Sequence, residues 1–462
     1  MGAPSTDLKL FIERLTTTVS KVILSDSALF IVPSLATTLA SGLLFWLLRD
    51  YAASELNAMA VVIMSAVVLS MVGTATFQFL IYKKVGEVNL SEKPITEEKG
   101  INTLLSLGIV TSVVFSMLVS GIAYPYFKYV LNYSLLQFVF FGVLLILYSV
   151  TWVLTASFWA SGKYKYPAFV FAFSYVAVFV LSYSVHQIDP TYTLCGYVAG
   201  IAILVTLLTL ESQRVFGITL KCSKLLEATA TMPKLISTEY WGILFQVFFI
   251  IALLLDKVIV WISEGERAGS GLQILGPYTT GAFLGLVPTL GIVALARFTE
   301  KVKPLSKDMY TGTLNDIRRR ITEYNSLYRK GLVTMLAVGL VLLAVAAVFA
   351  AYQPRDTRVL TIVLTVGFGA ILFEVILYNS FVLPIFGKSH ISTMSVLIVC
   401  LCGILTVPFI SNDIWFASLG FLFGSFVGFM ISQLWTTRLL LNFDYNAFRA
   451  FQMMRQTTKS VV

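Results

Sequence analysis

A few polar side chains lie inside long apolar stretches of this sequence, and these residues are the ones that could do chemistry. Asp256 and Lys257 are adjacent near the end of one stretch, and Gln246 lies eleven residues before Lys257 on the same helical face. Glu374 lies near the middle of another stretch, with Asn379 one and a half turns further on. A charged side chain at the centre of a bilayer is costly, so such a residue is a functional candidate by default.

We therefore expect Asp256, Lys257 and Gln246 to line the outer half of a polar substrate path, and Glu374 its middle. A simpler arrangement is that Lys257 extends to the outer membrane surface while Asp256 pairs locally. Three roles are open for Glu374: a proton- or cation-coupling carboxylate, a hydrogen-bonding group on the path, or a structural glutamate that stays protonated. The complete set of predicted path residues is Asp256, Lys257, Gln246, Glu374, Asn379 and Arg297.

The elements that must position these residues follow from composition. The chain has 462 residues, of which 57% are apolar and only 12% charged, and its mean hydropathy is +0.85. Soluble proteins are closer to a quarter charged, so these values exclude a soluble enzyme and a disordered or fibrous chain. At about 20 apolar residues per span, the chain has room for about a dozen transmembrane helices. We predict an all-α polytopic membrane protein with twelve spans, at 24–48, 57–82, 101–123, 134–158, 167–186, 192–210, 240–262, 277–298, 331–352, 360–386, 391–410 and 412–436.

The placement of basic residues orients these spans. With both termini in the cytoplasm, 27 of the 33 Lys and Arg residues lie in cytoplasmic segments, 5 lie in outer loops, and Lys257 lies inside a span. Basic residues concentrate on the cytoplasmic side, so we predict a membrane protein with cytoplasmic N- and C-termini. Arg297, at the cytoplasmic end of span eight, suits this topological role as well as a place on the path. The net charge of +9 is explained by short basic loops beside anionic lipid, and nucleic-acid binding is not expected.

The spans divide into two sets of six, an organisation common in transporters built from duplicated helical bundles. We predict two six-helix lobes around a central cavity. The predicted parts are a cytoplasmic amphipathic segment at 1–23, an N-terminal lobe at 24–210, a cytoplasmic linker at 211–239, a C-terminal lobe at 240–436 with a basic cytoplasmic loop at 299–330, and a cytoplasmic tail at 437–462.

Three cytoplasmic segments have amphipathic helical patterns and are expected to lie at the membrane surface. In the second of them, four apolar or aromatic residues share one face beside the run Arg318, Arg319 and Arg320. The alternative is a docking surface for a cytoplasmic partner, and we assign these three arginines to partner binding. The three segments are 7–22, 314–328 and 438–455.

Motifs for catalysis, metal binding or a cofactor do not accompany these features. The sequence has no GxxxxGK[ST] phosphate loop, no HExxH and no GxSxG. It has only two histidines, His186 and His390, and its four cysteines have no CxxC spacing. We therefore predict neither an enzyme activity nor a bound metal or cofactor.

The residues from Leu255 to Trp261, which read LDKVIVW, resemble the DKxxxW segment of span seven in the Pel polysaccharide exporter family, the G component of that bacterial machinery. Looser similarity extends over about residues 30–450. Glu374 has no counterpart in the family pattern. As in the family, a Tyr, a Phe-Leu pair, a Pro and an Arg follow the motif, here Tyr278, Phe283, Leu284, Pro288 and Arg297.

The resemblance implies a member of the multidrug/oligosaccharidyl-lipid/polysaccharide (MOP) transporter superfamily. It implies a polysaccharide or lipid-linked glycan as substrate, and a cytoplasmic glycosyltransferase and other membrane subunits of an export machinery as partners. We predict an inner-membrane transporter that exports or flips a polysaccharide through a central polar cavity. The alternatives are a lipid-linked oligosaccharide flippase or a cation-coupled antiporter of the same superfamily, and a non-transporting membrane scaffold for a glycosyltransferase.

Overall fold

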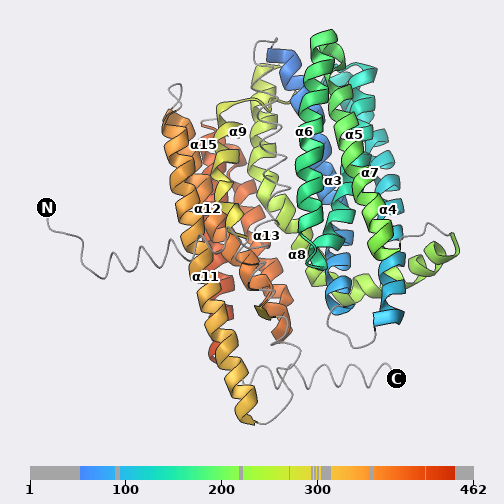
Figure 1. The fold of residues 1–462 in the computed structure, drawn as a ribbon. Helices are drawn as coiled ribbons and strands as arrows, with labels where there is room; N and C mark the ends of the chain where they lie inside the picture. Colours follow the sequence, from blue (N-terminus) through green and yellow to red (C-terminus); the bar gives the residue numbers. More distant parts are fainter. Residues whose placement is uncertain are drawn as a thin grey trace. The chain divides into compact units, whose positions relative to one another are not determined.

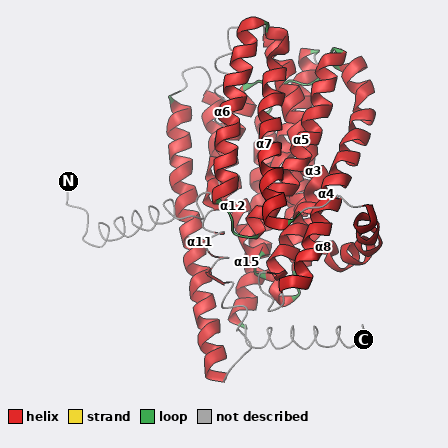
Figure 2. Ribbon diagram, turned by 45° about the vertical axis from the view of Figure 1, so that its right-hand side comes forward, coloured by secondary structure: helices red, strands yellow, loops and turns green. Residues whose placement is uncertain are grey.

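The structure, a computed structural model, describes residues 53–442 except for short gaps. The gaps are 89–93, 218–221, 270, 293–294, 296–297, 299–300, 303–313, 353–356 and 411–412. Within the described residues every regular element is a helix (Figure 2). The helices form two compact units. The described part of the N-terminal unit comprises 53–254 and 258–276, and that of the C-terminal unit comprises 255–257 and 277–442.

Ten helices of the described chain are long and apolar enough to cross a membrane. They correspond to every predicted span except the first, which lies outside the described residues, and the eighth, which is broken. Figure 1 labels the main elements. The N-terminal unit contains α3 (Ala53–Val88), α4 (Pro94–Pro125), η2 (Tyr126–Val130), α5 (Leu135–Ala160), α6 (Lys165–Ile188), η3 (Pro190–Tyr192), α7 (Thr193–Phe216) and most of α8 (Cys222–Ala268).

The break between α6 and α7 lies where the sequence predicts it, at Asp189 and Pro190. Helix α6 ends at Ile188, and the single 3₁₀ turn η3 leads into α7. Nδ1 of His186 lies 2.7 Å from Oγ1 of Thr193, whose hydroxyl donates to the carbonyl of Pro190 at 2.7 Å. These bonds close the turn, so His186 has a local structural role in the connection.

Buried tyrosines join three helices of the N-terminal unit. The hydroxyl of Tyr148 on α5 lies 2.8 Å from that of Tyr197 on α7 and 3.4 Å from that of Tyr175 on α6. All three side chains are buried. Each hydroxyl therefore has a partner away from water, which a buried polar group needs.

Two glycines let α7 approach α6 closely. A Cβ at Gly196 would lie 2.5 Å from the backbone nitrogen of Ser182, and one at Gly200 would lie 2.6 Å from the backbone nitrogen of Val178. Glycines four residues apart are a common device for close packing of membrane helices. The main chains of α6 and α7 therefore meet without intervening side chains.

We expect Gly200→Ala to destabilise the protein by about 1–3 kcal/mol, because the added methyl group collides with the backbone of α6. This loss would exceed the roughly 1 kcal/mol that alanine gains over glycine in a helix. The measurement is unfolding of the purified protein in detergent. The matched control is Gly121→Ala on α4, where no atom lies within 4 Å of the new methyl group, and it should be neutral or stabilising. Equal stability of the two variants would contradict this packing.

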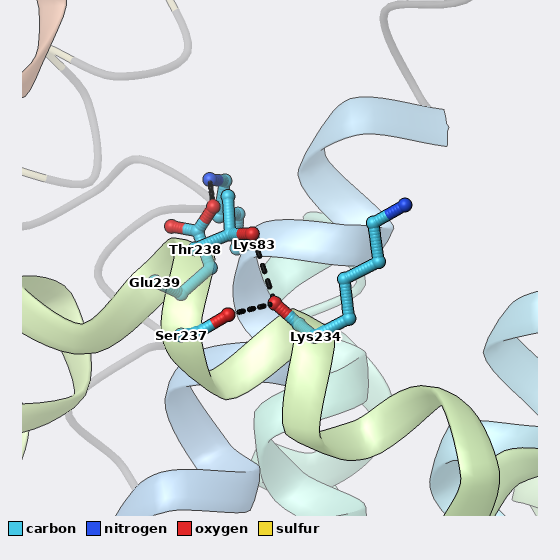
Figure 3. A network of polar contacts seen from close by, with 5 residues as sticks. All are labelled: Lys83, Lys234, Ser237, Thr238 and Glu239. Atoms are coloured by element: carbon cyan, nitrogen blue, oxygen red, sulfur yellow. Dashed lines mark hydrogen bonds and ion pairs between the residues drawn. The ribbon is translucent and has the colours of Figure 1, made fainter. Parts of the chain in front are cut away.

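Helix α8 includes residues from the segment that the sequence assigns to a linker. It contains Pro233, and the hydroxyls of Ser237 and Thr238 donate to the carbonyl of Lys234 at 2.8 and 2.9 Å (Figure 3). Proline removes a helical donor, and hydroxyls bonded to the backbone in this way bend helices. The next residue, Glu239, forms an ion pair with Lys83 of α3. The ion pair holds this part of α8 against the end of α3.

The C-terminal unit contains the broken span. Its elements are α9 (Pro277–Gly285), η4 (Val287–Ile292), α11 (Leu314–Ala351), α12 (Thr357–Ser380), η5 (Leu383–Phe386), α13 (Ser389–Leu405), α14 (Val407–Ile410) and α15 (Trp415–Leu441). The sequence predicts one span at 277–298, but the α-helix α9 ends at Gly285 and the chain continues as the 3₁₀ segment η4. Pro288 has no N–H to donate, so the regular helix does not pass through it.

Small residues bring α9 against α12. A Cβ at Gly281 would lie 3.2 Å from the carbonyl oxygen of Val359, and one at Gly285 would lie 3.1 Å from that of Val363. The break and the close packing therefore lie in the same short segment.

The pattern at 314–328 does not form a separate surface helix. These residues are the first turns of α11, which continues into span nine as one helix. Tyr324 and Tyr328 are buried in a core cluster with Phe298, Tyr378 and Phe386. The apolar face has a protein partner here, so it has no need of the membrane surface. Segment 7–22, and the tail beyond residue 442, lie outside the described residues.

Candidate functional site

Asp256 and Lys257 form a buried ion pair. Their exposed fractions are 2% and 0%, and Nζ of Lys257 lies 2.8 Å from Oδ1 of Asp256. The hydroxyl of Tyr278 on α9 donates to Oδ2 of Asp256 at 2.8 Å. Nζ of Lys257 also lies 5.6 Å from the ring centroid of Phe421 on α15. Both carboxylate oxygens therefore have a partner, and the lysine has an anion and an aromatic face.

The pair belongs to the C-terminal unit with α9 and α15, although it lies on α8. A buried pair with good hydrogen bonds is tolerated, whereas a single buried charge is strongly destabilising. The two residues and Tyr278 thus hold three helices together. Tyr278 follows the motif by some twenty residues in the sequence, and the pattern that predicted a polar stripe did not identify it as the partner.

Gln246 belongs to the N-terminal unit and lies on α8, nearly three turns before the ion pair. Its side chain is half-buried. It makes no hydrogen bond with any other described residue. An amide of this kind is available to a polar ligand.

Glu374 lies on α12 with only 4% of its surface exposed. Neither of its carboxylate oxygens has a hydrogen-bond partner among the described residues. A Cβ at Gly291 of η4 would lie 2.9 Å from Oε2 of Glu374 and 3.4 Å from the carbonyl oxygen of Met335 on α11. The carboxyl group therefore faces the 3₁₀ segment of the broken span, beside a glycine that leaves room for it.

An ionised carboxylate in such a place would be very costly, because the nearby backbone N–H of Ile292 in η4 does not by itself replace the water that the carboxylate loses. The group must therefore be a neutral acid or be held by a cation in this conformation. A carboxyl group that can change its charge beside an interrupted helix could couple that change to movement of the helix.

Asn379 is the centre of a polar network between three helices. It is fully buried on α12, and its Oδ1 accepts a hydrogen bond of 2.6 Å from the hydroxyl of Tyr328 on α11. Its Nδ2 donates to Oγ of Ser432 at 3.2 Å and to Oε1 of Gln433 at 3.1 Å, both on α15. The hydroxyl of Tyr378 reaches the carbonyl of Tyr328 at 3.1 Å. Gln433 is a polar residue within an apolar stretch, and this signal could have identified it from the sequence.

The predicted partner-binding arginines lie on the first turns of α11. Arg318 and Arg319 are exposed, and Arg320 is half-buried. Two further cations of this helix, Arg329 and Lys330, are also exposed. Arg297 lies outside the described residues, so its place on the path stays a prediction. Within the described chain there is no cluster of three His, Cys, Asp or Glu side chains that could hold a metal ion.

The sequence profile of an exopolysaccharide exporter family, PelG (EPS-E), matches residues 15–448. This match confirms the resemblance that the DKxxxW motif indicates. No curated protein matches the chain.

Solved structures with a similar fold are transporters. A MATE transporter solved in complex with MaD5 has a TM-score of 0.65 and 12% identity, over 93% of this chain and 97% of that chain. A MOP superfamily transporter from Pyrococcus furiosus has a TM-score of 0.63 and 13% identity, over 92% and 96%. The MATE transporter ClbM has a TM-score of 0.60 and 13% identity, over 91% and 94%. These similarities confirm the predicted fold class, an all-α multi-pass membrane protein with twelve helices in two lobes.

Proposed function

Because the chain belongs to the PelG family of exopolysaccharide exporters and is a membrane transporter of the MOP superfamily, we propose that it moves a polysaccharide across the inner membrane. The family match, which extends over nearly the whole chain, is the observation that carries this proposal. The proposed topology has both termini in the cytoplasm, because the basic residues concentrate in the segments on that side.

The proposed substrate path is a central polar cavity that offers weak hydrogen bonds to a hydroxyl-rich chain. Gln246 is the best-suited of the predicted path residues, since its half-buried amide makes no hydrogen bond with a described residue. The contacts of Asp256, Lys257 and Asn379 are already satisfied by protein groups. We assign these three residues to shaping the wall of the path and Gln246 to contacting the sugar.

The proposed partner is a cytoplasmic glycosyltransferase that docks at the start of α11. Arg318 and Arg319 are exposed there, and Arg329 and Lys330 extend the basic surface. Such a surface suits an acidic patch on a protein, and complementary charge favours rapid and specific association. Anionic lipid and other membrane subunits of an export machinery are further proposed partners.

Replacing Arg318, Arg319 and Arg320 together with glutamine is expected to weaken glycosyltransferase binding roughly tenfold, because three charges contribute to one docking surface. Secreted polymer should fall in parallel. The measurements are co-purification of the enzyme from the producing cells and the sugar polymer in their medium. Replacing two other exposed lysines with glutamine is the matched control and should change neither quantity; they are Lys163, between α5 and α6, and Lys165, the first residue of α6.

Gln246→Leu distinguishes a transporter from a scaffold in the same cells. A transporter predicts that the variant still binds the glycosyltransferase but secretes less polymer. A scaffold predicts that secretion by Gln246→Leu equals that of the wild type, and that result would overturn the proposed function.

A cation-coupled antiporter is the second candidate, and Glu374 favours it. Its carboxyl group is buried, has no hydrogen-bond partner among the described residues and lies beside η4. ClbM, a transporter of the same fold, has been solved in complex with Rb⁺. In this candidate function, Glu374 binds a proton or a cation and the gradient of that ion drives transport. A lipid-linked oligosaccharide flippase could use the same device.

A further inference from the structure

A groove on the outside of the N-terminal unit lies between α4 and α5. It is shallow and widely open, with a volume of about 500 Å³. Met117 and Tyr124 of α4 and Phe138 and Val143 of α5 are among its lining residues. The surface of the groove is almost entirely apolar. It is therefore suited to a hydrocarbon chain.

Two glycines create the groove. No atom lies within 4 Å of the position that a Cβ of Gly121 would take, and a Cβ of Gly142 would meet only the side chain of Ser120, at 3.4 Å from Oγ. The surrounding surface of α4 is exposed and apolar at Leu118 and Ile122. In the apolar window of this span only 33% of the residues are buried, the lowest share among the described spans of the N-terminal unit. The described protein residues therefore leave this apolar face of α4 uncovered, as expected for a surface that meets lipid.

A lysine lies at one end of the groove. Lys128 belongs to η2, directly after α4, and its Nζ lies 5.6 Å from the ring centroid of Tyr124 and 5.4 Å from that of Tyr129. Tyr124 also lines the groove, with its ring edge-to-face against Phe138 at 5.0 Å. Lys128 forms no ion pair with any carboxylate that the structure describes. The rings of Tyr124 and Tyr129 hold the ammonium group of Lys128 at the end of the groove, where its charge is available to an anion.

The spacing of these groups matches a phospholipid. Lys128 follows Gly121 by seven residues, which corresponds to roughly 10 Å along a helix. The headgroup region on each side of a bilayer is roughly 5–8 Å thick, so a headgroup beside Lys128 would place its acyl chain at the level of Gly121. Tyrosines at such a position are typical of the membrane interface.

We propose that the groove between α4 and α5 is a binding site for an anionic phospholipid, with one acyl chain against Gly121 and Gly142 and the phosphate at Lys128. Lys128, a cation at the end of an apolar groove, distinguishes this site from a surface for a second helix, which would have no need of a charge. The site is independent of the polysaccharide path.

Native mass spectrometry of the purified full chain tests the proposal, with phosphatidylglycerol and phosphatidylethanolamine as competing probes. The wild type should retain phosphatidylglycerol preferentially. Lys128→Gln should reduce that preference about fivefold, because Lys128 attracts the net negative charge of phosphatidylglycerol, whereas the headgroup of phosphatidylethanolamine has no net charge. Gly121→Leu should displace the lipid altogether, because the new side chain fills the groove. The leucine meets no neighbouring atom at its Cβ, so the variant should fold normally.

Two matched substitutions control for general effects. Val114→Leu changes an exposed residue of α4 that does not line the groove, and Lys163→Gln removes an exposed lysine at the other end of α5; both should bind lipid like the wild type. Equal retention of the two lipids by the wild type would mean ordinary surrounding lipid and would overturn the proposal. A wild-type dimer that Gly121→Leu dissociates would also overturn it, since a second copy would then occupy the groove.

Discussion

Lys257→Met is expected to lower the free energy of unfolding by about 3–5 kcal/mol, because it leaves Asp256 as an uncompensated charge inside the C-terminal unit. Methionine has a long unbranched chain like that of lysine, so the loss comes from the charge and not from a cavity. The measurement is denaturant or thermal unfolding of the purified protein in detergent. Lys330→Met, at an exposed position of α11, is the control and should change stability by no more than about 0.5 kcal/mol.

The double variant Asp256→Asn with Lys257→Met tests whether Lys257→Met loses stability because of the unpaired charge or because of the new side chain at position 257. An asparagine oxygen can still accept the hydrogen bond of Tyr278, and both charges are gone. Replacing a whole buried pair by neutral groups is often nearly without cost, so most of the lost stability should return. If instead Lys257→Met folds as well as the wild type but no longer exports polymer, the pair contacts the substrate and the structural interpretation is wrong.

Glu374→Gln is expected to leave stability nearly unchanged but to reduce ion-driven transport at least roughly tenfold. Glutamine has the shape of a protonated glutamate, so it fits the same space beside Gly291 without a charge. It cannot gain or lose a proton, and it is a weaker cation ligand than a carboxylate. The measurement is polymer or substrate movement in vesicles with an imposed proton or sodium gradient.

Glu374→Asp is the matched control, because it keeps an ionisable group on the same helix and shortens it by one methylene. It should retain part of the gradient dependence that Glu374→Gln loses. Wild-type transport by Glu374→Gln would mean that the residue is a structural, protonated glutamate. The antiporter candidate would then be wrong, while the exporter proposal would stand.

Helix boundaries that are marked by turn residues were predictable because those residues act locally, whereas the start of α8 at Cys222 was not, since the sequence predicts that span from residue 240. The fourth span, predicted at 134–158, is observed as α5 at Leu135–Ala160, and the break predicted between spans five and six is present at Asp189 and Pro190. Hydropathy and turn residues act over one segment at a time, so no tertiary information is needed. The errors have a different origin. Span eight is interrupted at Pro288, and the amphipathic turns of α11 continue into a span.

Both errors concern what a segment packs against. The start of α11 has an amphipathic sequence, and the face with Tyr324 and Tyr328 could pack against either lipid or protein. In the folded chain it packs against aromatic residues of the protein. The break in span eight is accommodated because α12 packs directly on Gly281 and Gly285. The sequence pattern of one helix carries no information about which other helices pack against it.

By itself, the sequence determined that this is a membrane protein with many spans, the ends of most helices and the residues inside the membrane that carry polar groups. It also identified the exporter family, because a short motif such as Asp256–Lys257 is read directly. Only the tertiary structure decided what each polar group touches. Asp256 and Lys257 neutralise each other under Tyr278, and Asn379 joins α11, α12 and α15. Glu374 has no such partner, although all four residues are comparably buried. The physical reason is that the cost of a buried polar group depends on its neighbours in space, which folding brings together from distant parts of the chain.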